Sequence, residues 1–182
     1  MSALSRSGQC ALGAGPGRLR PVVLSVATIV IGLFVSACND GRVQQPIDYS
    51  HKAHVESAGL ACLDCHQTAG TGIRASLPAL ETCGGCHADD PVTESPEEVI
   101  LLKFVAEGSE VPWKKVYNVP DHVYFSHRRH VSGGKVTCQE CHGDVGSFAS
   151  AVSSPFLPVT MENCMNCHRD RSVTNDCLSC HR

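Results

Sequence analysis

The sequence predicts a mainly α-helical fold with much irregular loop and little or no sheet, built around a bound group rather than an aromatic core. Of the 182 residues, 12 are Cys and 10 are His, whereas only 5% are Phe, Trp or Tyr. So few aromatic side chains cannot fill an ordinary interior. A hydrophobic content of 42% disfavours a disordered or fibrous chain, and a formal net charge of -3 disfavours a nucleic-acid-binding protein.

Residues 1–37 have the pattern of a bacterial lipoprotein signal peptide. Arg18 and Arg20 precede an uncharged apolar run over residues 21–35, which is shorter than the roughly 20 residues of a membrane-spanning helix. The run leads into Val-Ser-Ala-Cys, which is similar to the bacterial lipobox, so Cys38 is the expected lipidated first residue of the mature protein. A plain signal peptide, or a short anchor helix with an incidental cysteine, is the alternative interpretation.

We therefore expect a protein held by lipid to a membrane on the periplasmic side of a bacterial cell. Removal of residues 1–37 takes away three arginines and no acidic residue, which leaves 12 basic and 18 acidic residues and a net charge of -6. Cys10 is lost with the leader. Residues 38–48 are expected to form a linker ahead of the folded part.

The cysteines that follow Cys38 all belong to five motifs of one form, Cys-x-x-Cys-His. We number these motifs in chain order: motif 1 (Cys62, Cys65, His66), motif 2 (Cys83, Cys86, His87), motif 3 (Cys138, Cys141, His142), motif 4 (Cys164, Cys167, His168) and motif 5 (Cys177, Cys180, His181).

Covalent attachment of c-type haem requires this spacing. On one helical turn the two thiols reach the two vinyl groups of the porphyrin, and the adjacent imidazole is presented to the iron. Zinc ribbons do not require a His after each pair, disulfides impose no equal spacing, and a thioredoxin-like motif occurs once. The five motifs therefore predict five closely stacked haem c groups, wrapped by short helices, with the motif histidines as proximal ligands.

Four of the remaining histidines lie in two matching frames. His51 and His54 precede motif 1 and follow Tyr-Ser, and His127 and His130 precede motif 3 and follow Phe-Ser. Matched positions, from these histidines to the motifs, are all 76 residues apart. The chain therefore contains a duplicated module.

Each copy of the module continues to a second motif, and motif 5 is appended to the second copy. We expect a dihaem module at residues 49–90, a connector at 91–121 and a trihaem module at 122–182. Together they would form one compact multihaem domain over residues 49–182.

Five histidines outside the motifs match five irons, so they are candidate distal ligands: His51, His54, His122, His127 and His130. Two histidines three positions apart share one face of a helical turn at different heights. We expect one to serve the first haem of its own module and the other a neighbouring haem. Solvated surface histidines are the alternative. For the haem of motif 4, Met161 and Met165 are competing ligands, because a thioether can replace imidazole, although a packing role is the ordinary one for methionine.

The connector is expected to contain one longer helix. Ser95 is placed to cap it, Pro96 suits its first position, and Glu98 would complete a capping box. Gly108 is the expected stop, and an extended stretch over residues 111–120 follows.

With these motifs, residues 49–182 resemble class III multihaem cytochromes c, whose stacked haems mostly have two histidine ligands. Residues 96–171 are similar to the pentahaem cytochrome subunit of alternative complex III and related quinol-oxidising complexes. This similarity rests on Pro-Trp at 112–113, on Val-Tyr-Asn-Val-Pro-Asp-His-Val-Tyr-Phe-Ser-His at 116–127, and on Thr-Met before motif 4. It implies a subunit that passes electrons away from an iron–sulfur or molybdopterin-like partner. Those subunits often carry a transmembrane helix, whereas this chain has a lipobox-like segment.

The expected function is electron transfer rather than catalysis. Irons that keep two histidine ligands change oxidation state without ligand exchange. The partner would be a membrane redox complex or a soluble electron carrier, steered by the acidic surface. The alternative is a multihaem oxidoreductase of the nitrite or hydroxylamine type, but such an enzyme needs an open haem position, and the pentahaem nitrite reductases resemble a longer chain with a Cys-x-x-Cys-Lys motif, which is absent here.

Overall fold

The computed structural model describes residues 41–88 and 90–181, which lie in one compact unit, Asp40–Arg182. The expected leader, residues 1–37, and the expected lipidation site, Cys38, lie outside the described residues. None of the helices within 41–88 and 90–181 combines the length and apolar character needed to cross a bilayer.

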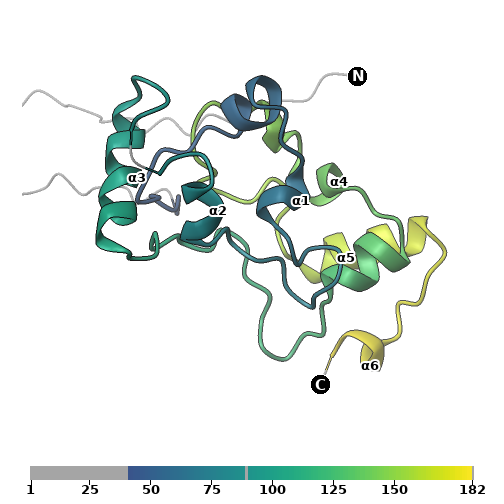
Figure 1. The fold of residues 1–182 in the computed structure, drawn as a ribbon. Helices are drawn as coiled ribbons and strands as arrows, with labels where there is room; N and C mark the ends of the chain where they lie inside the picture. The colour runs from purple at the N-terminus through teal and green to yellow at the C-terminus, as the bar shows by residue number, and fades with distance from the viewer. Residues whose placement is uncertain (1–40, 89, 182) are drawn as a thin grey trace, which may run out of the picture. The chain divides into compact units, whose positions relative to one another are not determined.

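Short helices joined by long loops make up the described chain (Figure 1). In order they are the π-helical turn η1 (Ala53–Ser57), α1 (Cys62–Cys65), α2 (Leu80–Gly84), α3 (Pro96–Glu107), the π-helical turn η2 (Arg129–Gly133), α4 (Cys138–His142), the 3-10 turn η3 (Val145–Ser147), α5 (Met161–Asp170) and α6 (Cys177–Cys180).

Sheet is absent from residues 41–88 and 90–181, apart from one isolated antiparallel bridge between Val123 and His181. Residues 111–120 are extended but belong to no strand. The Gln45 side-chain amide pairs with the backbone of this stretch at Lys114, because it donates to Lys114 O (2.9 Å) and accepts from Lys114 N (3.0 Å). The expected fold class, short helices and irregular loop with little or no sheet, is confirmed.

Helix α3 begins and ends where the local sequence predicts. Ser95 Oγ accepts a hydrogen bond from Glu97 N (3.3 Å), Pro96 is the first helical residue, and Gly108 ends the helix at φ 63°. The expected capping box is wrong. Glu98 does not return to the Ser95 backbone, whose N–H donates to Thr93 Oγ1 instead (3.2 Å). The Glu98 carboxylate turns away from the helix end to bind His87 (2.5 Å) and the backbone before the helix.

The duplication predicted from the sequence extends to backbone geometry. In both copies the His-x-x-His segment enters a π-helical turn, η1 in the first copy and η2 in the second, at positions 76 residues apart. The following motif helices are also capped alike, because Asp64 accepts from Ala61 N and Glu140 accepts from Thr137 N, each at 2.8 Å. The same sequence pattern has folded in the same way twice.

The two copies dock on each other through reciprocal contacts. Lys52 N donates to Phe148 O, and its equivalent Arg128 N donates to Gly72 O, each at 2.9 Å. Gly72 and Phe148 are themselves equivalent, since they too are 76 positions apart. Two copies that contact each other through the same pair of positions are related by an approximate two-fold axis.

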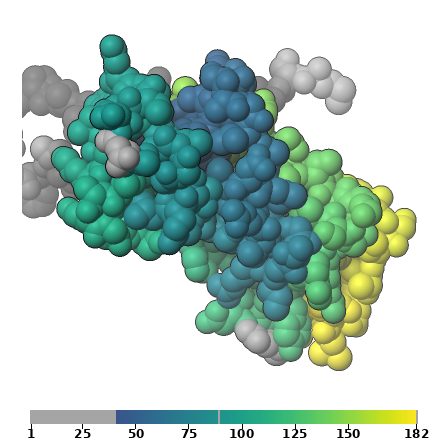
Figure 2. Space-filling view, viewed as in Figure 1, coloured from purple at the N-terminus to yellow at the C-terminus, as the bar shows by residue number. Residues whose placement is uncertain are grey.

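Side chains alone form very little core. Among the described residues, the buried apolar ones are Ile47, Ala69 and Val111, and no side chain is less than 2% exposed. Large apolar side chains are instead exposed to solvent, such as Leu178 (82% exposed) and Phe156 (64% exposed). In the space-filling view the blue segment, which includes η1 and α1, lies between the teal segment around α2 and α3 and the green-to-yellow second copy (Figure 2). A polypeptide of this size with so few buried apolar residues needs a further apolar component to fold stably.

Candidate haem-binding sites

The paired cysteines of each motif lie in or beside a short helix. Helices α1, α4 and α6 each begin at the first cysteine of their motif, α5 contains both cysteines of motif 4, and α2 carries the first cysteine of motif 2. Thiols three positions apart in a helical turn project from one face. This arrangement is the one that attachment to two vinyl groups requires.

Three motif histidines are oriented by a hydrogen bond at Nδ1. His66 Nδ1 donates to Ser76 O and His168 Nδ1 to Thr174 O, both at 2.7 Å, and His87 Nδ1 lies 2.5 Å from Glu98 Oε1. Since carbonyl and carboxylate oxygens only accept, the proton sits on Nδ1, and the lone pair is left on Nε2. Nε2 is then free to bind a metal.

The second histidine of each His-x-x-His frame is held in the same way. His54 Nδ1 donates to Ser50 O (2.9 Å), and His130 Nδ1 donates to Ser126 O (2.8 Å). An aromatic ring covers each imidazole, Tyr49 over His54 at 4.4 Å and 26°, and Phe125 over His130 at 4.6 Å and 24°. The hydrogen bond and the covering ring together fix the orientation of each imidazole.

Four motif histidines each face a histidine from outside the motifs. The ring centroids are 6.1 Å apart for His54 and His87, 6.2 Å for His130 and His168, 6.5 Å for His127 and His142, and 5.6 Å for His122 and His181.

These separations fit a shared metal ion. A bond between a metal and an imidazole nitrogen is about 2.0–2.1 Å long, so two imidazoles on opposite sides of one iron have centroids about 6 Å apart. The scarcity of buried apolar residues fits the same group, because a porphyrin plane would cover open side chains such as Leu178. The residues present therefore fit a haem at each of these four pairs.

His51 and His66 are left for the fifth site. Burial, and next the charge of the neighbouring His66, lower the pKa of His51 to about 4, so His51 is uncharged at neutral pH. His51 Nδ1 is buried without a hydrogen-bond partner. Among the described residues, the rings of His51 and His66 do not face each other at the separation found in the other four pairs, so this fifth pair is the less complete one.

The structure does not favour Met161 or Met165 as the distal ligand of the motif 4 haem. His168 already faces His130, and the Met161 side chain is 65% exposed at the start of α5. Met165 O accepts a hydrogen bond from Asn175 Nδ2 (3.2 Å), which involves its backbone and not its sulfur. The geometry favours His130 as the partner of His168.

Neighbouring thiols show which motifs adjoin. For four thiols, the largest influence that raises the pKa after burial is a thiol of another motif: Cys65 for Cys83, Cys62 for Cys138, Cys167 for Cys141 and Cys180 for Cys164. Cys62 and Cys138, which lie close to each other, are equivalent positions of the two copies. The motifs therefore follow one another in space in the order 2, 1, 3, 4, 5. Figure 1 shows the helices in the same succession, from α2 beside α3, through α1, to α4, α5 and α6.

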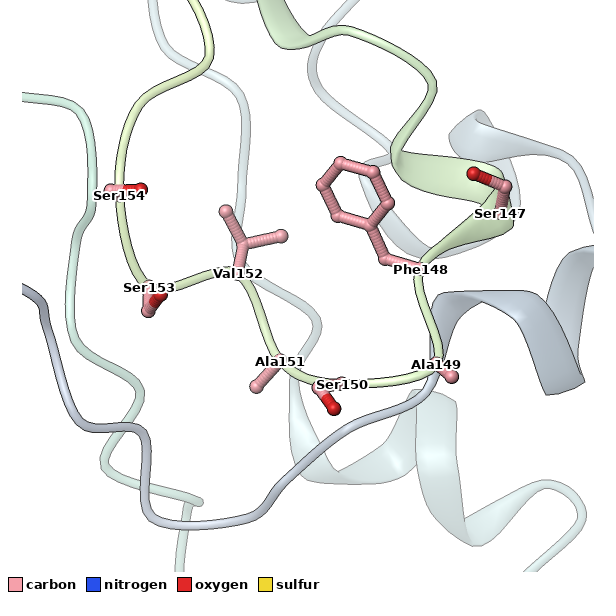
Figure 3. Close-up of a pocket in the computed structure, with 8 residues that line it drawn as sticks. All are labelled: Ser147, Phe148, Ala149, Ser150, Ala151, Val152, Ser153 and Ser154. Carbon is pink, nitrogen blue, oxygen red and sulfur yellow. The ribbon is translucent and has the colours of Figure 1, made fainter. Parts of the chain in front are cut away.

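A hollow of 440 Å³ lies within the loop of residues 147–154, where Phe148 and Val152 point to its inner side (Figure 3). Serine, alanine, valine and phenylalanine line it, and it contains no predicted site residue.

Among the described residues, no three or more His, Cys, Asp or Glu side chains form a cluster that could hold a metal ion by itself, and the ten motif cysteines form no disulfides. Pairs of histidines, not clusters, are the recurring feature.

A protein-family model describing cytochrome c7 and related cytochrome c matches residues 47–99 and 123–182. These two segments contain all five motifs and four of the five histidines outside them, and His122 lies directly before the second segment. The chain belongs to this cytochrome c family. It is a multihaem cytochrome c, so haem c is its cofactor and electron transfer, rather than catalysis, is its role.

A curated relative places this cytochrome more narrowly. The chain is 32% identical over 162 residues to the multiheme cytochrome c subunit of menaquinone reductase from Nitratidesulfovibrio vulgaris, and the alignment covers 76% of this chain and 77% of the relative. The cytochrome is therefore related to subunits of quinol oxidoreductases, as the resemblance over residues 96–171 implies.

Sequence reasoning missed the carboxylate beside His87. The sequence pattern predicts a helix-capping role for Glu98. In the structure Glu98 is buried, and its carboxylate oxygens accept hydrogen bonds from His87, Val92 N (2.8 Å) and Thr93 N (2.7 Å). The hydrogen bond from Thr93 Oγ1, followed by the backbone and His87 bonds, lowers the pKa of Glu98 to about 2 against the opposing effect of burial. No local pattern in the sequence distinguishes Glu98 from Glu94 or Glu97 as the partner of His87.

Proposed function

We propose that this cytochrome is a periplasmic, lipid-anchored pentahaem protein that transfers electrons within or next to a membrane quinol or respiratory redox complex. The observation that carries the proposal is the pairing of histidines: four of the five motif histidines face a second histidine at the separation of two ligands on one iron. When bound, each haem iron takes up or releases one electron.

The distal ligands are assigned by these pairs. His54 serves motif 2, His127 motif 3, His130 motif 4 and His122 motif 5, and His51 remains for motif 1. In each His-x-x-His frame the first histidine thus serves the adjacent motif and the second histidine serves the next one. The Nδ1 bonds to Ser50 and Ser126 hold the second histidines in position and leave Nε2 for iron.

The spatial succession of the motifs supports a single line of redox centres. Motif 2 is at one end and motif 5 at the other, with motifs 1 and 3 meeting near the approximate two-fold axis at Cys62 and Cys138. Such a line conducts between two partners that dock at opposite ends.

Membership of a complex rests on the relative, which is named as a subunit of menaquinone reductase. Because the alignment covers about three quarters of each chain, the shared part is longer than either module alone. A soluble carrier remains the second partner class, since the mature chain has a net charge of -6 and would dock on a basic surface.

Carbon monoxide distinguishes electron transfer from haem catalysis. If both axial positions of every iron are filled by histidine, the reduced holoprotein should bind no carbon monoxide and should not reduce nitrite or hydroxylamine. Binding at one haem per chain, together with turnover of either substrate, would overturn the proposal in favour of a catalytic haem.

The anchor and the complex are tested together in membranes. Wild-type protein should fractionate with membranes and co-purify with membrane redox subunits, whereas Cys38→Ser should be released into the soluble periplasm with its haems intact. A Cys38→Ser protein that stays in the membrane fraction, with its leader cleaved as in the wild type, would refute the lipid anchor. A wild-type protein that purifies alone from gently solubilised membranes would refute the complex.

A further inference from the structure

His87 differs from the other motif histidines in the partner of its Nδ1. His66 and His168 donate to neutral backbone carbonyls, Ser76 O and Thr174 O. His87 faces the carboxylate of Glu98, at 2.5 Å between Nδ1 and Oε1. A charge-assisted hydrogen bond is shorter and stronger than one to a neutral carbonyl.

The donors around Glu98 show that its carboxylate is ionised. Both oxygens accept: Oε1 from His87 Nδ1 and Val92 N, and Oε2 from Thr93 N and Thr93 Oγ1. Only a deprotonated carboxylate accepts at all of these positions without offering a proton of its own. The Glu98 side chain is 4% exposed and that of His87 is 15% exposed, so water screens the contact weakly.

Helix α3 fixes this arrangement. Glu98 lies in the first turn, just after Ser95 and Pro96, and the loop before the helix wraps around its carboxylate through Val92 and Thr93. The carboxylate is thus held by three bonds besides that to His87. It cannot follow the imidazole away, which keeps the hydrogen bond in place in both oxidation states.

We propose that Glu98 is a positioning residue that lowers the potential of the haem of motif 2. The inference rests on the proposed function, since it assigns a ligand role to His87. An anionic acceptor draws the Nδ1 proton and makes the imidazole a stronger electron donor at Nε2, which favours ferric over ferrous iron.

Glu98→Gln tests the proposal, with Glu97→Gln as its control. The two substitutions remove the same charge from adjacent residues of one helix turn, but Glu97 binds the backbone of Asp48 (2.7 Å) instead of a histidine. In a spectroelectrochemical titration of the holoprotein, Glu98→Gln should shift one of five midpoint potentials upward and leave four near their wild-type values. Glu97→Gln should shift none selectively.

Thr93→Val supplies a result of opposite sign. It removes one donor from the carboxylate, leaves Glu98 and its charge in place, and so strengthens the bond to His87. The same midpoint potential should fall. If Glu98 has only a structural role, Glu98→Gln and Thr93→Val should shift the potential of this haem in the same direction. Equal shifts after Glu98→Gln and Glu97→Gln would also contradict the proposal.

Haem content separates the two levels of the argument. If the wild-type protein carries fewer than five haems, the proposed function fails. If all variants carry five low-spin haems and the motif 2 potential does not move upward in Glu98→Gln, the role of Glu98 is wrong and the proposed function stands. A Glu98→Gln protein that does not fold leaves Thr93→Val as the deciding variant, because a fall in one potential supports the proposal and no change overturns it.

Discussion

His130 and His168 hold their ring centroids 6.2 Å apart, although one belongs to the π-helical turn η2 and the other to helix α5. The equivalent histidine of the first copy, His54, has the same relationship to His87, at 6.1 Å. Duplication has therefore preserved a long-range pairing and not only a local motif. In both copies the second histidine of His-x-x-His reaches past the adjacent motif to the following one.

Replacement of His130 by Met should alter the haem of motif 4 and spare that of motif 3. A thioether ligand raises the haem potential relative to imidazole. In the reduced, diamagnetic protein, contacts between haem protons and the β protons of Cys164 and Cys167 identify the motif 4 haem by NMR. Its potential should rise, with the other four near wild type.

The matched variant is His127→Met, which should raise the potential of the motif 3 haem, because His127 faces His142. If His130→Met instead changed the haem attached at Cys138 and Cys141, the assignment of ligands across the motifs would be refuted.

Tyr117→Phe should destabilise the holoprotein by about 1–2 kcal/mol, since it removes a hydroxyl that links two segments. That hydroxyl donates to Cys141 O (3.1 Å) and accepts from Phe156 N (2.8 Å). Chemical denaturation at fixed pH measures the change. Tyr49→Phe is the control: Phe125 occupies the equivalent position, so its effect should lie within about 0.5 kcal/mol. Equal losses for the two variants would contradict the role of the Tyr117 hydroxyl.

Gly143→Ala should destabilise the protein by roughly 2–4 kcal/mol, the combined cost of a disfavoured backbone and of overpacking. Gly143 has φ 69°, and an added Cβ would lie 2.7 Å from the Phe156 ring. Thermal unfolding followed by circular dichroism reports the loss. Gly133→Ser is its counterpart, because Gly133 has no close neighbour and Ser57 stands at the equivalent position. A Gly143→Ala protein as stable as Gly133→Ser would show that the Phe156 contact is not as described.

Removal of motif 5 by Cys177→Ala with Cys180→Ala should leave a protein with four haems. Motif 5 adjoins motif 4 through Cys164 and Cys180, so the potential of the motif 4 haem should shift most. The motif 2 haem, at the other end, should hardly change, because charge interactions weaken with distance and screening. Individual potentials followed by NMR during a redox titration measure this. Equal shifts at motifs 2 and 4 would contradict the spatial order.

Local signals in the sequence predicted those parts of the structure that depend on neighbouring residues. The bounds of α3 follow from Ser95, Pro96 and Gly108, and the helical turns of the motifs follow from their spacing. The duplication, too, is visible in the sequence, because equivalent positions keep a constant offset.

Contacts between distant segments could not be predicted in this way. The capping-box pattern at Ser95 and Glu98 is satisfied in many helices, but here the His87 imidazole lies within reach and offers the carboxylate a stronger partner. The reciprocal docking through Lys52 and Arg128 uses backbone atoms of loops, on which side-chain patterns carry no information. The pairing of each distal histidine likewise depends on how the two copies pack.

Haem stoichiometry combined with the spin state of the iron tests the central claim most directly. The mature protein, purified from its native membrane, should contain five covalently bound haems per chain by mass spectrometry and pyridine haemochrome absorbance. Its ferric form should show only low-spin signals in electron paramagnetic resonance, because every iron has two histidine ligands. Fewer than five haems, or a high-spin signal from one haem in five, would contradict the account of five histidine-paired sites.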